Sequence, residues 1–254
     1  MIFNQRSRLM KSNILLRFAI AGTLLVAGSV SGQLIDDFSG DLSNYTQTVI
    51  LDVNGAASNA TTFEINSGEL QFTTAGYDDI EQTAFIYNGL TLGVGEEVQA
   101  DVPSGTINGN RNFGLYVGGT APAAGVRQDY ITIYGGSDNS GNNRFFSRGF
   151  QGTDEFDNPG AEPTDGTSVE QLFIARTATN TFEAGFYDSG LGRVVVTTRT
   201  PTTPNTADFV GFYADVRADG VVGTLDNLTV VPEPSTSLLF GLGAFGLLAL
   251  RRRS

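Results

Sequence analysis

Cysteine, histidine and tryptophan are all absent from the 254 residues. Without cysteine, no disulfide can hold the chain, so its stability must come from a buried apolar core. The lack of histidine and cysteine also excludes an ordinary zinc site, a cysteine nucleophile and a serine triad with an imidazole base. Several common classes of enzyme are therefore excluded by composition alone.

Basic residues are scarce in the central part of the chain. Residues 33–231 contain eight arginines and no lysine against 26 acidic residues, which gives a net charge of −18. A protein that binds phosphate backbones needs a basic surface, so we expect no nucleic-acid partner. The acidity is typical of a soluble exported protein, and binding of divalent cations or of a cationic matrix is the alternative interpretation.

The N-terminal segment has the order of a secretory signal peptide. Lys11 precedes an apolar run over residues 14–30, interrupted by Arg17, and small residues then lead to Gly32. We predict that residues 1–32 are removed by cleavage after Gly32, with Met1 or Met10 as the start. A transmembrane anchor is the alternative, but the stretch after Arg17 is too short to span a bilayer comfortably.

The C-terminal segment contains three parts in a fixed order. Pro232, Glu233 and Pro234 come first, an apolar run over residues 238–250 follows, and Arg251, Arg252 and Arg253 close the chain. Thirteen helical residues reach about 20 Å, which is short of the roughly 30 Å hydrocarbon core of a bilayer. The arginines would stay on the cytoplasmic side, leaving the Pro-Glu-Pro element outside and open to a membrane protease. The segment therefore predicts a temporary anchor.

These three parts resemble the PEP-CTERM sorting signal, over residues 232–254. The resemblance implies a Gram-negative bacterium in which an exosortase of the inner membrane processes the tail after export by the secretion machinery. It also implies an association with exopolysaccharide and biofilm matrix, at the cell surface or beyond it. A chance Pro-Glu-Pro before a plain membrane anchor is the alternative.

Residues 33–231 read as one all-β domain of roughly 200 residues. Short apolar-polar alternations are separated by Gly, Asn, Asp or Pro, and no amphipathic helix is evident. We expect an antiparallel β-sandwich whose core includes Leu172, Ile174, Phe182 and Phe186, extended by Phe209, Phe212, Val216 and Leu225. The predicted strands are 46–53, 63–65, 69–73, 84–87, 97–102, 112–117, 129–134, 144–150, 170–176, 181–187, 194–200, 208–216 and 224–231.

Three stretches resemble concanavalin A-like, or laminin-G-like, jelly rolls. They are the opening run from Ile35 to Tyr45, the run from Leu172 to Arg176 and the closing run from Gly223 to Val230. The resemblance implies that the first and last strands lie side by side. Another β-sandwich is the alternative, and a propeller or solenoid is disfavoured because no fixed repeat period is present.

No strand carries the pattern of carboxylates that glycoside hydrolysis requires. Retaining enzymes need two carboxylates about 5 to 5.5 Å apart. Glu96 and Glu97 would point to opposite faces of a strand, and residues 78–81 read as a loop. We therefore expect no enzymatic activity, with a glycoside hydrolase acting on matrix polysaccharide as the alternative.

Aromatic and polar residues of the central strands suggest sugar binding instead. Glycan sites combine aromatic ring faces with amides and acids at their rims. The candidates are Asn112, Tyr116, Arg127, Asp129, Tyr130 and Tyr134. Ordinary residues of a solvated sheet are the alternative interpretation.

Acidic residues raise the further possibility of structural calcium, which prefers carboxylate and carbonyl oxygens. In similar jelly rolls, acids near the first and last strands meet such an ion, and this would correspond to Asp36 or Asp37 and Asp226. Surface acids, with Asp226 capping a turn, are the alternative. The acidic stretch 153–167 contains Pro159 and Pro163 and is predicted to be a flexible solvated loop.

The sequence therefore predicts an exported, non-catalytic adhesive or glycan-binding protein with an extracellular polysaccharide as partner. A purely structural matrix protein is the third possibility beside the enzyme. No cofactor is required by this interpretation, although calcium stays open.

Overall fold

The computed structural model describes residues 32–53, 61–75, 79–103, 113–137, 143–164, 168–203, 205–217 and 222–232. Within these ranges the chain forms β-strands and no helix. The described residues therefore contain no helical segment that could cross a membrane. The strands are β1 (Gln33–Asp36), β2 (Tyr45–Asp52), β3 (Thr61–Asn66), β4 (Glu69–Thr74), β5 (Glu81–Tyr87), β6 (Glu96–Asp101), β7 (Phe113–Gly118), β8 (Tyr130–Ser137), β9 (Asn143–Gln151), β10 (Asp154–Ala161), β11 (Val169–Ala178), β12 (Thr181–Asp188), β13 (Gly192–Arg199), β14 (Phe209–Val216) and β15 (Val222–Pro232).

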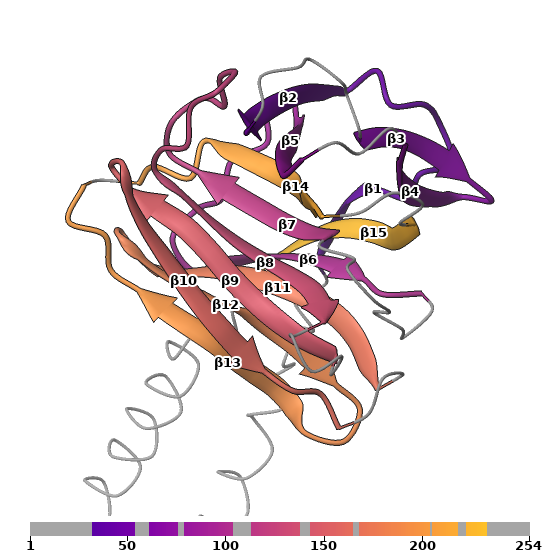
Figure 1. The fold of residues 1–254 in the computed structure, drawn as a ribbon. Coiled ribbons are helices and arrows are strands. Elements are labelled where there is room, and N and C mark those ends of the chain that lie inside the picture. The colour runs from indigo at the N-terminus through magenta and orange to yellow at the C-terminus, as the bar shows by residue number, and fades with distance from the viewer. Residues whose placement is uncertain are drawn as a thin grey trace, which may run out of the picture. The chain divides into compact units, whose positions relative to one another are not determined.

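The strands form two sheets of eight and seven strands. The eight-stranded sheet has the order β13-β12-β11-β6-β15-β4-β3, with β1 also paired to β15, and the seven-stranded sheet has the order β10-β9-β8-β7-β14-β5-β2. All neighbouring strands are antiparallel. Figure 1 shows β8, β9 and β10 in front of β11 and β12. The all-β sandwich is confirmed, and the pairing of β1 with β15 agrees with the concanavalin A-like jelly roll.

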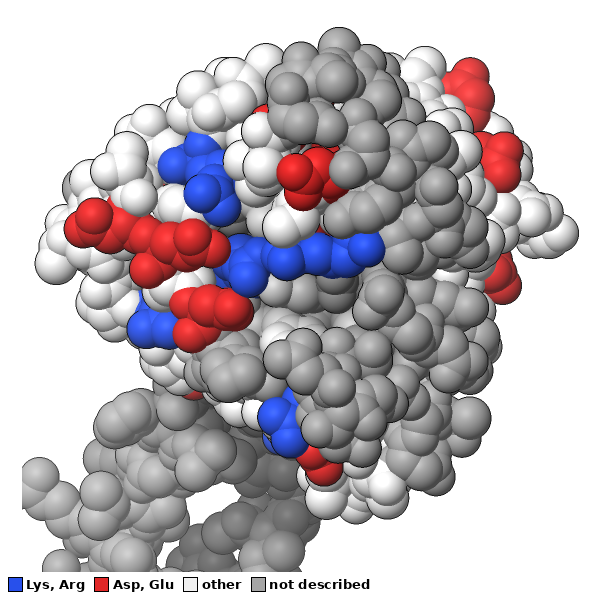
Figure 2. All heavy atoms as spheres, in the orientation of Figure 1, with Lys and Arg blue, Asp and Glu red and all other residues white. Residues whose placement is uncertain are grey.

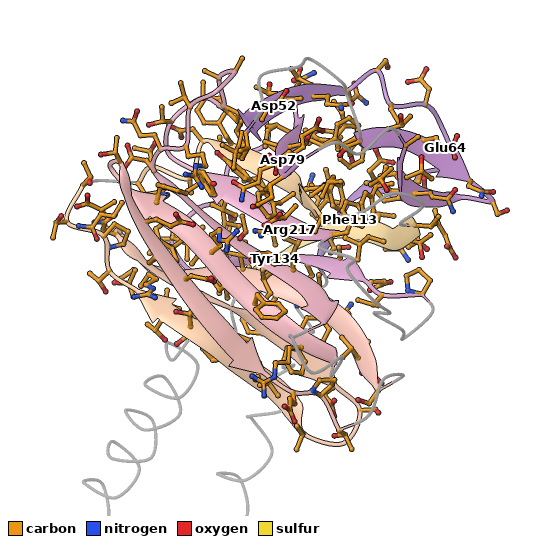
Figure 3. All side chains as sticks on the ribbon, viewed as in Figure 1. Asp52, Glu64, Asp79, Phe113, Tyr134 and Arg217 are labelled. Atoms are coloured by element: carbon orange, nitrogen blue, oxygen red, sulfur yellow. The ribbon has the colours of Figure 1, made fainter. Side chains whose placement is uncertain are left out.

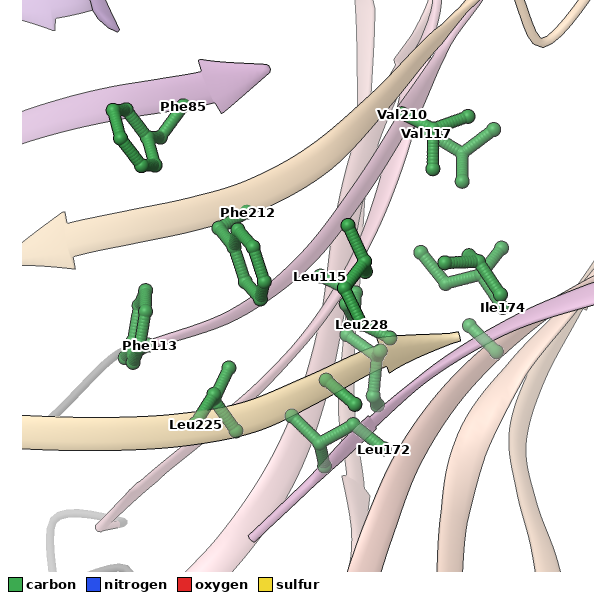
Figure 4. Close-up of a cluster of buried hydrophobic side chains, with 14 of the residues drawn as sticks. Phe85, Phe113, Leu115, Val117, Leu172, Ile174, Val210, Phe212, Leu225 and Leu228 are labelled. Carbon is green, nitrogen blue, oxygen red and sulfur yellow. The ribbon is translucent and has the colours of Figure 1, made fainter. Parts of the chain in front are cut away.

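The core lies between the two sheets and is built by alternate residues of each strand. Leu115 and Phe212 from the seven-stranded sheet meet Leu172, Ile174 and Leu225 from the eight-stranded sheet (Figure 4). In the absence of disulfides, this apolar layer supplies the main stabilisation of the fold. The four residues first predicted for the core, Leu172, Ile174, Phe182 and Phe186, are all fully buried.

Strand β14 shows how alternation separates the two faces of one strand. Val210, Phe212 and Ala214 point into the core, whereas Tyr213 belongs to a second cluster on the opposite face of the sheet. Phe209 is half-buried against that second cluster, so its predicted place in the core layer is wrong. Its position is one residue out of phase with Phe212.

The acidic stretch 153–167 contains a strand, which corrects the predicted loop. β10 pairs with β9 at the edge of the seven-stranded sheet, and the register shifts between Asn158 and Ala161, around Pro159. An edge position tolerates proline and charge because one side of the strand needs no partner. Glu155 and Asp157 also gain an ion-pair partner on β9, which sequence alternation alone could not indicate.

A pair of substitutions on β14 tests the face assignment. Phe212→Ala removes a fully buried ring and should lower the free energy of unfolding by about 3 to 5 kcal/mol. Phe209→Ala, three residues earlier, removes a half-buried ring and should cost roughly half as much or less. Urea unfolding followed by tyrosine fluorescence gives both values. Equal losses would contradict the assigned alternation.

Candidate functional site

The face of the seven-stranded sheet that points away from the core carries a cluster of aromatic residues. We call it the tyrosine face, because adjacent strands β7, β8 and β14 place Tyr116, Tyr130, Tyr134 and Tyr213 on it. Tyr116 and Tyr130 stack with ring centroids 4.9 Å apart, and Tyr134 lies 5.4 Å from Tyr213. Three of the predicted glycan-binding residues, Tyr116, Tyr130 and Tyr134, are therefore brought together.

Arg148 of β9 connects the tyrosine face to three carboxylates. Its Nη1 lies 2.8 Å from Oδ2 of Asp215, its Nη2 lies 3.1 Å from Oδ2 of Asp157, and its Nε lies 3.2 Å from Oε1 of Glu155. Arg217 makes a second ion pair with Asp215, with its Nε 2.8 Å from Oδ1. Because the Asp215 side chain is only 1% exposed, these two guanidinium groups compensate a charge that would otherwise be buried alone.

Two tyrosine hydroxyls on this face lack hydrogen-bond partners among the described residues. They belong to Tyr130 and Tyr213, and Oε1 of the neighbouring Gln82 is also unpaired. Burial is the main cause of a raised pKa at both tyrosines, so both hydroxyls stay protonated at neutral pH and can donate. A buried polar group without a partner is costly, and a new partner would recover that cost.

The predicted aromatic residues do not form an open ring platform. Tyr116 and Tyr130 are each 1% exposed, and Tyr134 is 4% exposed. The more accessible ring is that of Phe146 on β9, which stacks on Tyr134 with centroids 5.8 Å apart. A ligand on this face would therefore contact Phe146 first.

The remaining predicted glycan-binding residues have different positions. Arg127 lies at the rim, 4.7 Å above the Phe150 ring and 3.7 Å from Glu155. Asp129 is turned inward, where its carboxylate accepts hydrogen bonds from the Gly152 backbone N–H and from Thr120. Asn112 lies outside the described residues.

The rim of the tyrosine face carries charges of both signs. Figure 2 shows basic and acidic side chains side by side on the face over β9 and β10. Glu155 and Asp157 are 40% and 46% exposed, so their outward oxygens are accessible to solvent. Figure 3 shows Tyr134 and Arg217 near the middle of the same sheet. The face thus combines accessible carboxylates and guanidinium groups with a half-exposed ring.

The acids considered for calcium are arranged differently. Asp36 and Asp37 accept hydrogen bonds from the backbone N–H groups of Phe38 and Ser39, and Asp226 accepts one from Asn227. Among the described residues, no group of three or more acidic side chains could hold a metal ion. The structure gives these acids local turn-forming contacts, and the calcium prediction gains no geometric support from them.

Sequence reasoning missed Phe146, Arg148, Asp215 and Arg217. The signal was present in the predicted strands, since Phe146, Arg148 and Phe150 alternate on one face of β9 next to Tyr130 and Tyr134 of β8. The ion pair between Arg148 and Asp215 spans 67 residues and two intervening strands. Only the strand order brings these two residues together.

The C-terminal end of the chain matches a family model described as the PEP-CTERM protein-sorting motif, over residues 230–253. The chain carries a PEP-CTERM sorting signal. This signal indicates an exported protein that is anchored transiently in a membrane and then processed by an exosortase. Of the motif residues named from the sequence, Pro232 ends β15, whereas Glu233, Pro234 and Arg251 to Arg253 lie outside the described residues.

Several solved structures are similar to this chain at low sequence identity. A Bacillus subtilis protein of unknown function with a galectin-like fold is 9% identical, covering 80% of this chain and 98% of that one with a TM-score of 0.44. The carbohydrate recognition domain of Emp46p, in a potassium-bound form, is 10% identical over 76% and 91%, with a TM-score of 0.46. A xylan beta-1,4-xylosidase from Bacillus halodurans is 11% identical over 77% of this chain and 38% of that one, with a TM-score of 0.48. A comparison with curated proteins gave no match.

The buried ion pairs predict a large effect of Asp215→Asn on stability. The substitution leaves Arg148 and Arg217 without their shared counter-charge and should lower the free energy of unfolding by about 2 to 4 kcal/mol. Glu183→Gln on the eight-stranded sheet is the matched control, because Glu183 pairs with the half-exposed Arg193 and should cost less than about 1 kcal/mol. Urea unfolding of both variants measures the difference, and a smaller loss for Asp215→Asn than for the control would contradict it.

Substitution of Asp226 is expected to stabilise the fold at neutral pH, unlike substitution of Asp215. Burial is the largest cause of its raised pKa, and the charges of Asp101 and Asp37 add to it, against the opposing hydrogen bond from the Asn227 backbone N–H; folding therefore disfavours the ionised carboxylate. A raised pKa means that the stability contribution of this group is present at acidic pH and is lost as pH rises through the folded value. Asp226→Asn should therefore raise the Tm at neutral pH in the presence of a chelator, and this gain should disappear near pH 3. A lower Tm at neutral pH would contradict the argument.

Proposed function

We propose that this exported protein binds extracellular polysaccharide through the tyrosine face without catalysing a reaction on it. The observation that carries the proposal is the ion-pair cluster of Arg148 with the accessible carboxylates of Glu155 and Asp157, on the same face of the sheet as the half-exposed Phe146 ring. Sugars offer many hydroxyl groups that both donate and accept hydrogen bonds. Carboxylates, guanidinium groups and a half-exposed ring together match such a ligand.

The charges of the tyrosine face favour an uncharged glycan. Arg127, Arg148 and Arg217 are balanced by three carboxylates, those of Glu155, Asp157 and Asp215. Each arginine is already paired, so no guanidinium is left to compensate a uronate or a sulfate. The acidity of the whole domain also opposes the approach of a polyanion. A neutral polysaccharide is therefore the ligand class we propose.

The same contacts support a binding role rather than hydrolysis. A glycosidase acid must hold a proton near neutral pH, which requires an environment that raises its pKa. Such an acid must also reach the glycosidic oxygen, whereas the Asp215 side chain is only 1% exposed and each of its two oxygens is held by a guanidinium group. We propose that the protein acts in the matrix of a Gram-negative bacterium, as an adhesive component associated with exopolysaccharide.

Binding to exopolysaccharide fragments tests the proposal. A recombinant domain of residues 33–231 should bind neutral oligosaccharides measurably by calorimetry and should bind uronate-containing ones more weakly. Phe146→Ala removes the accessible ring and should weaken binding by roughly tenfold. Glu155→Gln should weaken it severalfold through the loss of charge-assisted hydrogen bonds.

Glu183→Gln is the matched control for Glu155→Gln, because it makes the same chemical change on a strand of the other sheet. It should leave the affinity unchanged. Absence of binding across neutral and anionic fragments, with and without calcium, would overturn the proposal in favour of a structural matrix protein. Turnover of a bound fragment would instead establish an enzyme.

A further inference from the structure

The sorting signal begins inside the folded domain. The matched motif starts at residue 230, whereas β15 continues to Pro232, so the first three motif residues belong to the sheet. Pro232 is also the first residue of the Pro-Glu-Pro element. No linker separates the last strand of the sandwich from the element that the processing protease recognises.

The end of β15 is held by strands on both of its sides. On one side, Val230, Val231 and Pro232 are opposite Val98, Glu97 and Glu96 of β6. On the other side, Val230 is opposite Gln33 of β1. The Val230 side chain is buried in the core between the sheets. The residues directly before Glu233 are therefore fixed in extended form with β-sheet neighbours.

A protease that binds its substrate as an extended strand needs the backbone groups of several residues around the scissile bond. In β15, Val230 is paired with both β6 and β1, and Val231 and Pro232 are paired with β6. Access to residues 230–232 then requires local opening of the strand end, which reduces the population of cleavable chain. The folded domain thus competes with the protease for the same three residues.

We propose that the folded sandwich itself limits the removal of its sorting tail. The tail is cut after Pro232 or further along the chain, so that the mature chain keeps all of β15. The rate of cutting depends on how often the end of β15 opens. An incompletely folded chain, with β15 unpaired, is cut faster and at more positions. The pairing of β15 is in this sense a regulatory element of the sorting pathway.

Gly32, after which the signal peptide is predicted to be cleaved, lies beside the same strand end. A Cβ atom placed on Gly32 would be 2.3 Å from Cγ1 of Val231 and 2.8 Å from Cγ2 of Thr229, so a larger residue there would have to displace these two side chains. The signal peptide is expected to end at this residue. β15 is the last of the strands to be synthesised. Cleavage after Gly32 can therefore occur before β15 pairs with its neighbours. In a chain that folded before cleavage, the pairing of β15 would protect both the Gly32 site and the tail site.

The experiment separates the Pro-Glu-Pro element from the sheet in the full-length chain. A six-residue Gly-Ser linker is inserted between Val231 and Pro232, which leaves β15 paired up to Val231 and keeps residues 232–254 intact. The chain is expressed with its processing protease, and pulse-chase labelling gives the rate of tail loss. We expect the linker to raise this rate roughly tenfold, which corresponds to about 1.4 kcal/mol of opening free energy.

The matched control carries the same linker between Ser67 and Gly68, in the turn that joins β3 to β4. It should be processed at the original rate, and thermal unfolding should show that both variants are folded. Mass spectrometry of the mature original chain should place its C-terminus at Pro232 or later. The proposal would be overturned if the original chain and the Val231–Pro232 linker chain lost their tails at equal rates, or if neither was processed. A mature C-terminus before Pro232 would also overturn it.

Discussion

Strand β15 is the element on which the eight-stranded sheet depends. It pairs with β6 along one side, and along the other it pairs with β4 through residues 222–225 and with β1 through residues 228–230. Leu225 and Leu228 of the same strand are buried in the core. Three segments distant in sequence are thus joined only when the last strand is in place. Contacts between segments so distant in sequence form late in folding, because closing the long loops costs conformational entropy before the new contacts provide stabilisation.

The two faces of the seven-stranded sheet have different surroundings and, under the proposed function, different roles. Successive residues of β14 show the division, since Phe212 packs in the core, Tyr213 lies on the tyrosine face and Ala214 returns to the core. Asp215, on the tyrosine face, binds Arg148 and Arg217. A rigid core therefore fixes the position of every polar group on the opposite face. Under the proposed function, the polar groups of this face need little ordering when the glycan binds.

Alternation of apolar residues was enough to predict the fold class and the positions of most strands. It failed for β10, whose charged residues gain their partners only from β9. It also failed for Phe209, which lies on the outer face of β14 and not on the predicted core face. For the candidate site, the structure places Tyr116, Tyr130 and Tyr134 in one cluster, but it buries them, which the sequence did not indicate. Burial on an outer face depends on neighbours such as Phe150 and Arg148, which arrive from another strand. Sequence periodicity carries no information on those neighbours.

The absence of cysteine connects the fold to the sorting signal. In a protein with cysteines, a disulfide can hold the first and last strands together. Here they are held by strand pairing instead, and the last strand ends at Pro232. The residues that complete the sandwich are then the same residues that lead into the Pro-Glu-Pro element. Any change that stabilises the end of β15 strengthens the domain and also opposes removal of the tail. Folding and release are therefore subject to one shared constraint, which acts through the pairing of Val230 with Val98 and Gln33.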